Sequence, residues 1–313
     1  MNWKVLVSPN TLLPVLDEYR HLLVDNGIEI VTPAPFTEFL SEDELMPLVH
    51  DIDGAICGDD LYTEKVLKRA GKLRVLSKWG EGLDAIDLEA AKRLNIAVFR
   101  TAGALTDPVA DTVMANILAF ARNVVSKDAS MKQGDWRKLT SVTLREGVLG
   151  IVGLGRIGKA VAKRAVSFGM EVIACDIRTI AGDYLQGAGI RMGSFTEVIT
   201  NADYVSLCCD LNPSTIRIID REELVLMKDS AILINAARGQ LIAEAALVDA
   251  LRNETIAGAA LDVFEKEPLS RDSPLRTMNN CLLSAHNANA SPAVFDFIHR
   301  KTIDNVIAGL KDE

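Results

Sequence analysis

The fold of this chain is decided by one stretch, Gly147-Val148-Leu149-Gly150-Ile151-Val152-Gly153-Leu154-Gly155-Arg156-Ile157-Gly158. Its first half is apolar or small, as in a buried strand, and its second half has the spacing Gly-x-Gly-x-x-Gly. A helical pattern over residues 159–168 follows, and then a second apolar run that ends at Asp176, 18 residues after Gly158. A strand, a glycine turn, a helix and an acidic residue at this spacing are together typical of a dinucleotide-binding βαβ unit.

Each part of this unit has a chemical task. Gly153 allows the tight turn, Gly155 lets the backbone approach a pyrophosphate, and Gly158 lets the helix pack close to the strand. The helix begins near Arg156 and Ile157, where N–H groups and the positive end of the helix dipole favour phosphate. We therefore expect these five residues to bind the cofactor.

The acidic residue at the end of the second strand indicates which cofactor is bound. Asp176 is expected to accept hydrogen bonds from a ribose diol, and its carboxylate should repel a 2′-phosphate. The sequence therefore predicts NAD rather than NADP. Arg178, two residues further on, argues in the other direction.

Short apolar runs alternate with longer helical patterns along the whole chain, which predicts βαβ units and parallel sheets. The predicted strands of a first series are residues 5–7, 28–31, 54–57, 75–77 and 96–99. Those of a second series are residues 148–152, 171–175, 190–192, 204–208, 231–234, 256–261 and 281–284. A helix is predicted over residues 83–94. A longer one follows, with Asp107 as its N-cap, Pro108 at its first position and apolar spacing to Val124. The polar residues 126–145 look like an arm.

Polar or special residues stand just after the strands of the second series. Ligands of parallel α/β sheets bind at the carboxyl ends of the strands, so we expect the chemistry at this edge. The residues found there are Gly153, Asp176, Cys209, Asp210, Arg238, Asp262 and His286.

Two of these residues are suited to act on a small acid. The guanidinium of Arg238 can bind a carboxylate or a keto oxygen through paired hydrogen bonds. The imidazole of His286 is the usual proton donor and acceptor near neutral pH. A carboxylate beside His286 would fix its tautomer and stabilise the imidazolium. Glu265 and Glu267 both lie in the preceding segment, and the residues alone do not choose between them.

Composition limits the remaining function classes. The chain has 313 residues, 49% hydrophobic and 25% charged, which suggests two ordinary globular domains. Its net charge of −9 argues against binding to nucleic acid or anionic membranes. A signal peptide and an apolar run of the ~20 residues needed for a membrane helix are both lacking. The five cysteines have no CxxC or metal-ligand spacing, so we expect buried thiols, no bound metal and a cytoplasmic location.

Taken together, the motifs resemble the D-isomer-specific 2-hydroxyacid dehydrogenases, the family that includes phosphoglycerate dehydrogenase. The matching segments are residues 150–158, 234–239 and 260–268, then His286; residues 73–96 and 103–111 also resemble the family, and the likeness is weakest in the first 50 residues. The resemblance implies hydride transfer between NAD and C2 of a small D-2-hydroxy acid or 2-keto acid. It implies that Arg238 binds the carboxylate and carbonyl, that His286 is the acid/base, and that Glu267 is its partner.

The resemblance also implies the remaining site and the domains. Backbone amides of Gly80, Glu81 and Gly82 would hold the substrate carboxylate. The residues expected beside the cofactor are Cys209, Ala236, Ala237 and Asp262. The fold would be α/β with two Rossmann-like domains. An NAD-binding domain over residues 102–289 would be inserted in a smaller flavodoxin-like substrate domain of residues 1–101 and 290–313. Residues 105–145 resemble the dimerisation helix and arm of a homodimer.

Departures from the family pattern bear on the substrate. Cys208-Cys209-Asp210 stands where a histidine is common, which affects a contact on the adenosine side of the cofactor. The acidic loop 57–60 argues against 3-phosphoglycerate as the substrate. Since the chain ends at Glu313, feedback control by an amino acid is not expected. The leading hypothesis is an enzyme acting on glyoxylate, hydroxypyruvate or pyruvate. One alternative is an NAD(H)-sensing binding protein of the corepressor type. Another is a related dehydrogenase acting on formate or phosphite, selected by the polar Asn287 and Asn289.

Overall fold

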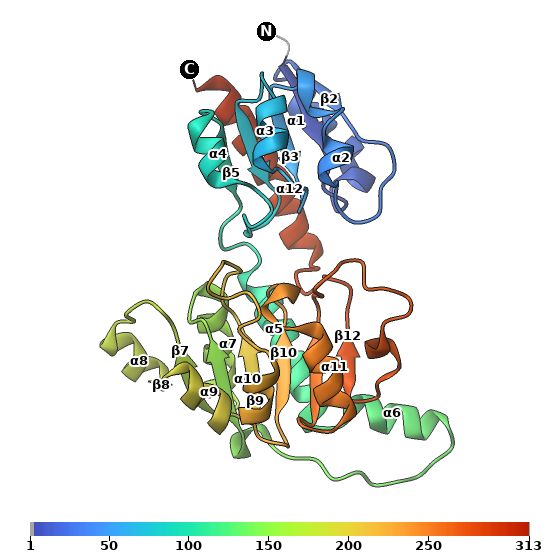
Figure 1. Ribbon diagram of the computed structural model, residues 1–313, viewed down its shortest axis with the longest axis vertical. Coiled ribbons are helices and arrows are strands. Elements are labelled where there is room, and N and C mark those ends of the chain that lie inside the picture. The colour runs from blue at the N-terminus through green and yellow to red at the C-terminus, as the bar shows by residue number, and fades with distance from the viewer. Residues whose placement is uncertain (1–2, 313) are drawn as a thin grey trace. The chain divides into compact units, whose positions relative to one another are not determined.

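The computed structural model describes residues 3–312 and divides them into two compact units (Figure 1). Unit 1 combines the residues up to Leu105 with those from Ala290 onward, and unit 2 is Thr106–Asn289. Unit 2 is therefore inserted in the sequence of unit 1. Each unit is an α/β fold around one parallel sheet, which confirms the predicted fold class.

Unit 1 contains a five-stranded parallel sheet with the order β2-β1-β3-β4-β5, which is the flavodoxin-like order. Its strands are β1 Trp3–Val7, β2 Ile28–Val31, β3 Gly54–Cys57, β4 Val75–Lys78 and β5 Ala97–Arg100. Its helices are α1 Leu16–Val24, α2 Glu42–Leu45, α3 Glu64–Arg69, α4 Leu88–Arg93 and α12 Pro292–Lys311, with 3-10 turns η1 Leu13–Val15 and η2 Val49–Asp51.

The last helix completes the core of unit 1. α12 packs on β3, β4 and β5, and Ser77 Oγ on β4 donates to the carbonyl of Thr302 at 2.9 Å. Gly54 and Gly309 make this approach possible, because a Cβ on either would lie 3.0 Å or less from a valine side chain. No helix within residues 3–312 is both long and apolar enough to cross a membrane.

Unit 2 contains a seven-stranded parallel sheet with the order β12-β11-β10-β9-β6-β7-β8. Its strands are β6 Val148–Val152, β7 Glu171–Cys175, β8 Ile190–Met192, β9 Tyr204–Leu207, β10 Ile232–Asn235, β11 Gly258–Leu261 and β12 Cys281–Leu283. Its helices are α5 Thr106–Ala121, α6 Val124–Lys132, α7 Arg156–Ser167, α8 Gly182–Ala188, α9 Phe195–Asn201, α10 Arg221–Leu226 and α11 Glu244–Arg252, with 3-10 turns η3 Leu144–Glu146, η4 Gly239–Leu241 and η5 Pro274–Thr277. The strand order reverses between β6 and β9, the switch point at which such sheets bind ligands.

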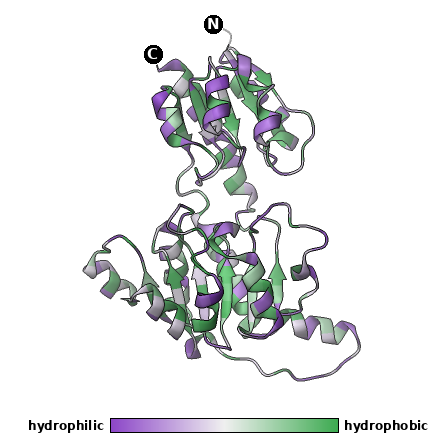
Figure 2. Cartoon of the chain, viewed as in Figure 1, coloured by the Kyte–Doolittle hydropathy of each residue, from purple (hydrophilic) through white to green (hydrophobic). Residues whose placement is uncertain are grey.

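Helices cover both faces of this sheet. Figure 2 shows its central strands as hydrophobic and the surrounding helices as mixed. One buried cluster joins α5 and α7 to β6, with Ile117, Val161 and Ile151 among its members. A second joins α9, α10 and α11 to the opposite face, through residues such as Val198 and Leu247. Because helices cover both faces, a ligand can reach this sheet at the ends of its strands.

Two predicted helix starts are wrong. α4 begins at Leu88 rather than residue 83, because the Asp87 side chain accepts from Ala90 N at 2.9 Å and caps the helix there. α5 begins at Thr106, so Asp107 lies in its first turn instead of capping it. Asp107 instead forms an ion pair with Arg164 of α7 at 2.9 Å.

The predicted long helix is also interrupted. α5 ends at Ala121, and Asn123 has a left-handed backbone with φ +53° that breaks the chain direction. Val124 then begins a separate helix, α6, and its side chain is 53% exposed instead of lying on the buried face of α5. The arm therefore contains a helix that the polar sequence did not predict.

Candidate functional site

The loops that follow β6, β7, β9, β10, β11 and β12 lie at one edge of the unit 2 sheet, because all its strands are parallel. The predicted residues of unit 2 lie in these loops, except Arg156, Ile157 and Gly158, which form the first turn of α7. Within this edge the structure brings two sets of residues into contact. One surrounds His286 after β12, and the other surrounds the glycine turn after β6.

His286 and Glu267 form a hydrogen-bonded pair, with Nδ1 of the imidazole 2.7 Å from Glu267 Oε2. Their side chains are 26% and 16% exposed. The other carboxylate oxygen of Glu267 accepts from Phe264 N at 2.9 Å, which fixes its direction. Glu265 instead forms an ion pair with Arg217 at 2.8 Å. Of the two glutamates that the sequence left open, Glu267 contacts the histidine.

The buried carboxylate of Asp262 holds the backbone around His286. Its oxygens accept from Ser284 Oγ at 2.5 Å, Asn287 N at 3.0 Å and Ala288 N at 2.8 Å. The carbonyl of Asp262 also accepts from His286 N at 2.7 Å, and His286 has a left-handed φ of +47°. Asp262 therefore orients the loop that carries His286, and its predicted position beside the cofactor stays a prediction.

A buried asparagine shapes the Arg238 loop, and sequence reasoning gave it no role. The side chain of Asn235, at the end of β10, accepts from Ala237 N at 3.0 Å and donates to the carbonyl of Arg238 at 2.8 Å. The guanidinium of Arg238 donates to the carbonyl of Ala237 at 2.8 Å. A short polar side chain at a strand end, just before the predicted site, was the available signal.

Gly239 lets two of the site loops touch. A Cβ at this position would lie 1.9 Å from the backbone carbonyl of Phe264 and 2.5 Å from Glu265 N. Gln240 adds a hydrogen bond from its side chain to the carbonyl of Glu265 at 3.2 Å. The loop that follows Arg238 is thus packed directly against the loop that carries Glu267.

The glycine turn after β6 fits a dinucleotide. Gly153 has φ +95°, and a Cβ on it would lie 2.7 Å from the backbone of Cys209 in the loop after β9. A Cβ on Gly158 would lie 2.2 Å from the carbonyl of Gly153, so α7 needs glycine there. At Gly155 the nearest neighbour would be Arg178 Nη2 at 3.6 Å, which leaves room for phosphate against the backbone.

The end of β7 presents an apolar side chain and an ion pair. Ile177 is 97% exposed there. Asp176 accepts from Leu154 N at 2.7 Å and forms a bidentate pair with Arg178 at 2.8 and 2.9 Å. Hydrogen bonds from Arg178 lower the pKa of the Asp176 carboxyl to about 2. Together with the turn, these residues could hold NAD.

In unit 1, the loop from Gly80 to Gly82 is held by the residues that follow β5. Gly80 has φ +113°, and its N–H donates to Thr101 Oγ1 at 3.0 Å, which removes it from the expected carboxylate donors. The Glu81 side chain accepts from Gly103 N, so its carboxylate is turned toward residues 101–103. The predicted role of this loop in binding a carboxylate stays a prediction.

The acidic loop after β3 has its charges compensated within unit 1. The buried ammonium of Lys78 lies 3.0 Å from Asp59 Oδ1. Asp60 accepts from Ser8 Oγ at 2.6 Å and from Leu40 N at 2.8 Å, and burial raises the pKa of its carboxyl. The loop is therefore less repulsive to a phosphate than its sequence suggests, so its acidic residues do not by themselves exclude 3-phosphoglycerate as a substrate.

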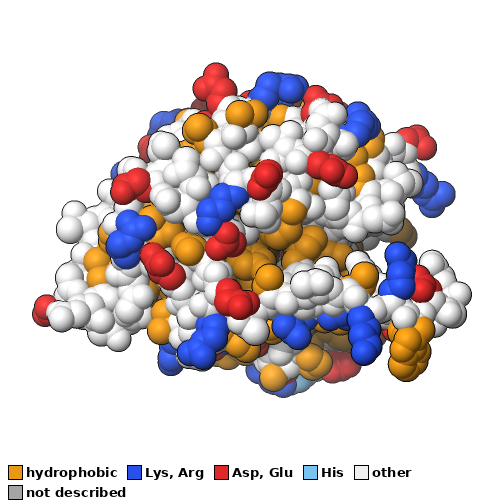
Figure 3. Space-filling view, turned by 90° about the horizontal axis from the view of Figure 1, so that it is seen from below, with side chains coloured by type: hydrophobic (Ala, Val, Ile, Leu, Met, Phe, Trp, Pro, Cys, Tyr) orange, Lys and Arg blue, Asp and Glu red, His pale blue; other side chains and the backbone are white. Residues whose placement is uncertain are grey.

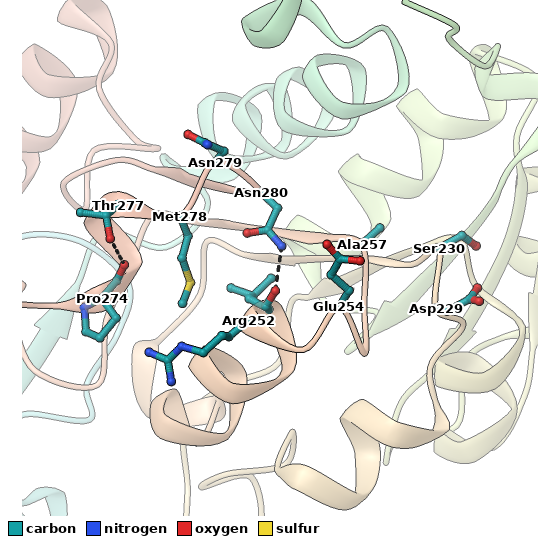
Figure 4. Close-up of a pocket in the computed structure, with 11 residues that line it drawn as sticks. Asp229, Ser230, Arg252, Glu254, Ala257, Pro274, Thr277, Met278, Asn279 and Asn280 are labelled. Atoms are coloured by element: carbon teal, nitrogen blue, oxygen red, sulfur yellow. Dashed lines mark hydrogen bonds between the residues drawn. The ribbon is translucent and has the colours of Figure 1, made fainter.

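A large hollow lies at the other edge of the unit 2 sheet (Figure 4). Its volume is about 900 Å³, and residues before β10, β11 and β12 line it, including Ser230, Ala257 and Asn280. The side chain of Asn280 donates a hydrogen bond to the carbonyl of Leu251 at 3.0 Å, so its amide is already paired within unit 2. The hollow is at the amino ends of the strands and contains none of the predicted site residues.

Comparison with known proteins finds relatives that match nearly the full length of the chain. Residues 114–288 match the model of the D-isomer specific 2-hydroxyacid dehydrogenase NAD binding domain. A D-3-phosphoglycerate dehydrogenase of Methanocaldococcus jannaschii is 39% identical over 90% of this chain, which spans only 53% of that relative. A glyoxylate reductase of Thermococcus litoralis is 36% identical, with 92% of each chain covered. The crystal structure of a D-lactate dehydrogenase from Aquifex aeolicus, complexed with NAD and lactic acid, superposes with a TM-score of 0.86 at 25% identity. That match covers 98% of this chain and 95% of the other.

Proposed function

Because the chain belongs to the D-isomer-specific 2-hydroxyacid dehydrogenases, we propose that it interconverts a small 2-keto acid and the corresponding D-2-hydroxy acid. NAD is the cofactor of this family's binding domain, and it supplies hydride transfer to and from C2 when bound. The observation that carries the proposal is the His286–Glu267 pair at the carboxyl edge of the sheet, in the loops beside Arg238. The matches favour this function over the corepressor and the formate or phosphite alternatives.

His286 moves the proton in this proposal. Since Nδ1 contacts Glu267, Nε2 is the nitrogen that would exchange a proton with the substrate oxygen. During reduction the imidazolium gives this proton to the oxygen at C2, and during oxidation the neutral imidazole takes it back. Glu267 keeps the tautomer fixed and stabilises the charged form.

Arg238 orients the substrate. Its planar guanidinium can bind a carboxylate oxygen and the keto oxygen together, which places C2 for hydride transfer and polarises the carbonyl. The bonds of Asn235 to Ala237 and Arg238 fix the loop from which the guanidinium extends. Arg238 therefore provides positioning and charge, whereas His286 provides the proton.

The substrate that we propose is a two- or three-carbon keto acid, with glyoxylate and hydroxypyruvate first. The support is the Thermococcus litoralis glyoxylate reductase, which matches this chain over 92% of both lengths. The phosphoglycerate dehydrogenase match covers only 53% of that protein, so it supports the family more than the substrate. 3-Phosphohydroxypyruvate belongs in any test, because Lys78 compensates the acidic loop of unit 1.

We expect NADH oxidation with glyoxylate or hydroxypyruvate, and a loss of about 10- to 100-fold in kcat/KM for Arg238→Lys. Lysine keeps the charge but lacks the paired donors that bind a carboxylate and a keto oxygen together. The measurement is NADH absorbance against a panel that adds pyruvate and 3-phosphohydroxypyruvate. Arg221→Ala is the control, because Arg221 is exposed and pairs with Asp249. Turnover of no keto acid, or equal activity of Arg238→Lys and wild type, would contradict the proposal.

We also propose that the chain forms a homodimer through α6 and the residues up to 143. Figure 3 shows hydrophobic side chains on the protruding segment at the right, where Figure 1 shows α6. The exposed apolar residues of this segment are Val124, Val125, Met131, Trp136 and Val142, and Trp136 is 80% exposed. A second copy would cover them.

Light scattering after size exclusion should give a mass near twice the 34.0 kDa of the chain. Trp136→Ala should shift this mass toward that of one chain, because it removes the most exposed apolar side chain of the segment. The control is Phe168→Ala, at an apolar side chain that is 49% exposed just after α7. A monomeric wild type would contradict the dimer and leave the proposed reaction untouched.

For location we propose the cytoplasm. All five cysteines are free, and burial raises the pKa of each thiol, to about 11 for Cys175 and Cys208 and to about 12 for Cys209 and Cys281. Unpaired, unreactive thiols suit a reducing compartment.

A further inference from the structure

The side chain of Arg178 binds the carboxylate of Asp176, which is the group expected to accept hydrogen bonds from the ribose. Its Nε and Nη2 atoms lie 2.9 and 2.8 Å from the two oxygens of Asp176, and its backbone N donates to one of them at 2.8 Å. Leu154 N donates to the other oxygen at 2.7 Å. Four donors therefore surround Asp176, and three of them belong to Arg178.

The exposed charge at this point is consequently positive. The side chain of Asp176 is 4% exposed, whereas that of Arg178 is 63% exposed. The guanidinium also reaches the glycine turn, because its Nη2 lies 3.6 Å from the position of a Cβ on Gly155. A dinucleotide that binds this turn would therefore contact the guanidinium of Arg178 more readily than the carboxylate of Asp176.

This arrangement removes the usual basis for selecting NAD. A free carboxylate after the second strand repels a 2′-phosphate, and an arginine nearby accommodates it. Here the two side chains form one neutral pair, so the repulsion by Asp176 is largely cancelled. The planar fork of Arg178 matches phosphate oxygens as well as it matches carboxylate oxygens. Asp210 also acts on Arg178 electrostatically, so some negative charge remains near the pair.

We propose that Arg178 makes this site accept NADP as well as NAD, by exchanging the Asp176 carboxylate for the 2′-phosphate as its partner. The inference rests on the proposed function, because it assumes that the dinucleotide lies along the glycine turn. With NAD, the ribose hydroxyls take the place of the phosphate and share the Asp176 oxygens with Arg178. Arg178 is thus the residue that sets cofactor specificity, and Asp176 alone does not.

The test is calorimetric titration of the full chain with NAD⁺ and NADP⁺, which requires no turnover. For the wild type we expect the Kd for NADP⁺ to be within about tenfold of the Kd for NAD⁺. In Arg178→Ala the carboxylate is uncompensated, so this ratio should rise by at least about tenfold, through weaker NADP⁺ binding. Arg191→Ala is the matched control, since Arg191 pairs with Glu171 at the opposite end of β7. The control should leave the ratio unchanged.

Two results would overturn the proposal. One is a wild type that binds NADP⁺ more than about 100-fold more weakly than NAD⁺. The other is an Arg178→Ala variant with the ratio of the wild type. If NAD⁺ binds and keto acids are reduced in either case, this inference fails and the proposed function stands. If neither dinucleotide binds, both fail.

Discussion

His286→Asn should lower kcat about 1000-fold while the protein stays folded, because it removes the group that we propose to move the proton. Asparagine is the right replacement, since His286 has φ +47° and asparagine tolerates the left-handed backbone. The hydrogen bonds from the loop to Asp262 involve backbone atoms of Asn287 and Ala288, so they remain. The measurement is steady-state NADH oxidation with the best keto acid, together with NADH binding.

The partner of His286 should matter less. Glu267→Gln keeps the shape of the side chain and removes its charge, so we expect a loss of about 10- to 100-fold in kcat.

The control for His286→Asn is His21→Asn, on the exposed face of α1, which should leave kcat unchanged. A His286→Asn enzyme within about threefold of wild type would rule out His286 as the acid/base, since that role contributes at least 100-fold.

Gly239→Ala should destabilise unit 2 by about 3 kcal/mol or more and abolish most activity. The added methyl group would lie 1.9 Å from the carbonyl of Phe264, which is backbone and cannot rotate away. The loop bearing Glu267 must therefore move, and the hydrogen bond from Gln240 to Glu265 is lost with it. Urea unfolding gives the change in free energy, and NADH oxidation gives the activity.

The control for this variant is Gly187→Ala in α8. A Cβ on Gly187 would have no neighbour within 4 Å, so only the helix preference changes. That preference should stabilise the protein by about 0.5–1 kcal/mol. If Gly239→Ala behaved like Gly187→Ala, the close packing of the two site loops would be wrong.

Much of the fold could be predicted from the sequence, because buried parallel strands are short, apolar and well separated. Even the weak run at residues 190–192 is a strand, β8. The helix ends were harder, since Asp107 and Asp87 look alike as capping residues. Asp87 caps α4, whereas Asp107 pairs with Arg164, which lies 57 residues away in the sequence. Such a distant partner leaves no local signal.

The site was predictable in its residue types and less so in its contacts. The strand ends pointed to Arg238 and His286, but the spacing could not separate Glu265 from Glu267. That choice depends on Arg217, which binds Glu265 from another part of the chain. The closure of Arg178 on Asp176 was equally hidden, since the two residues could as well point apart. The sequence predicts which groups are present, and only the folded loops show which groups pair.

Unit 1 is built from two segments that lie on either side of unit 2 in the sequence, and this affects how the chain folds during translation. Its sheet is formed by the first hundred residues, but its core is closed by α12, the helix Pro292–Lys311. On the ribosome, those twenty residues emerge only after the entire inserted unit. Unit 2 can therefore fold first, while one apolar face of the unit 1 sheet remains exposed until α12 is synthesised. We therefore expect the core of unit 1 to be completed during translation after unit 2, although most of its sheet is synthesised before unit 2.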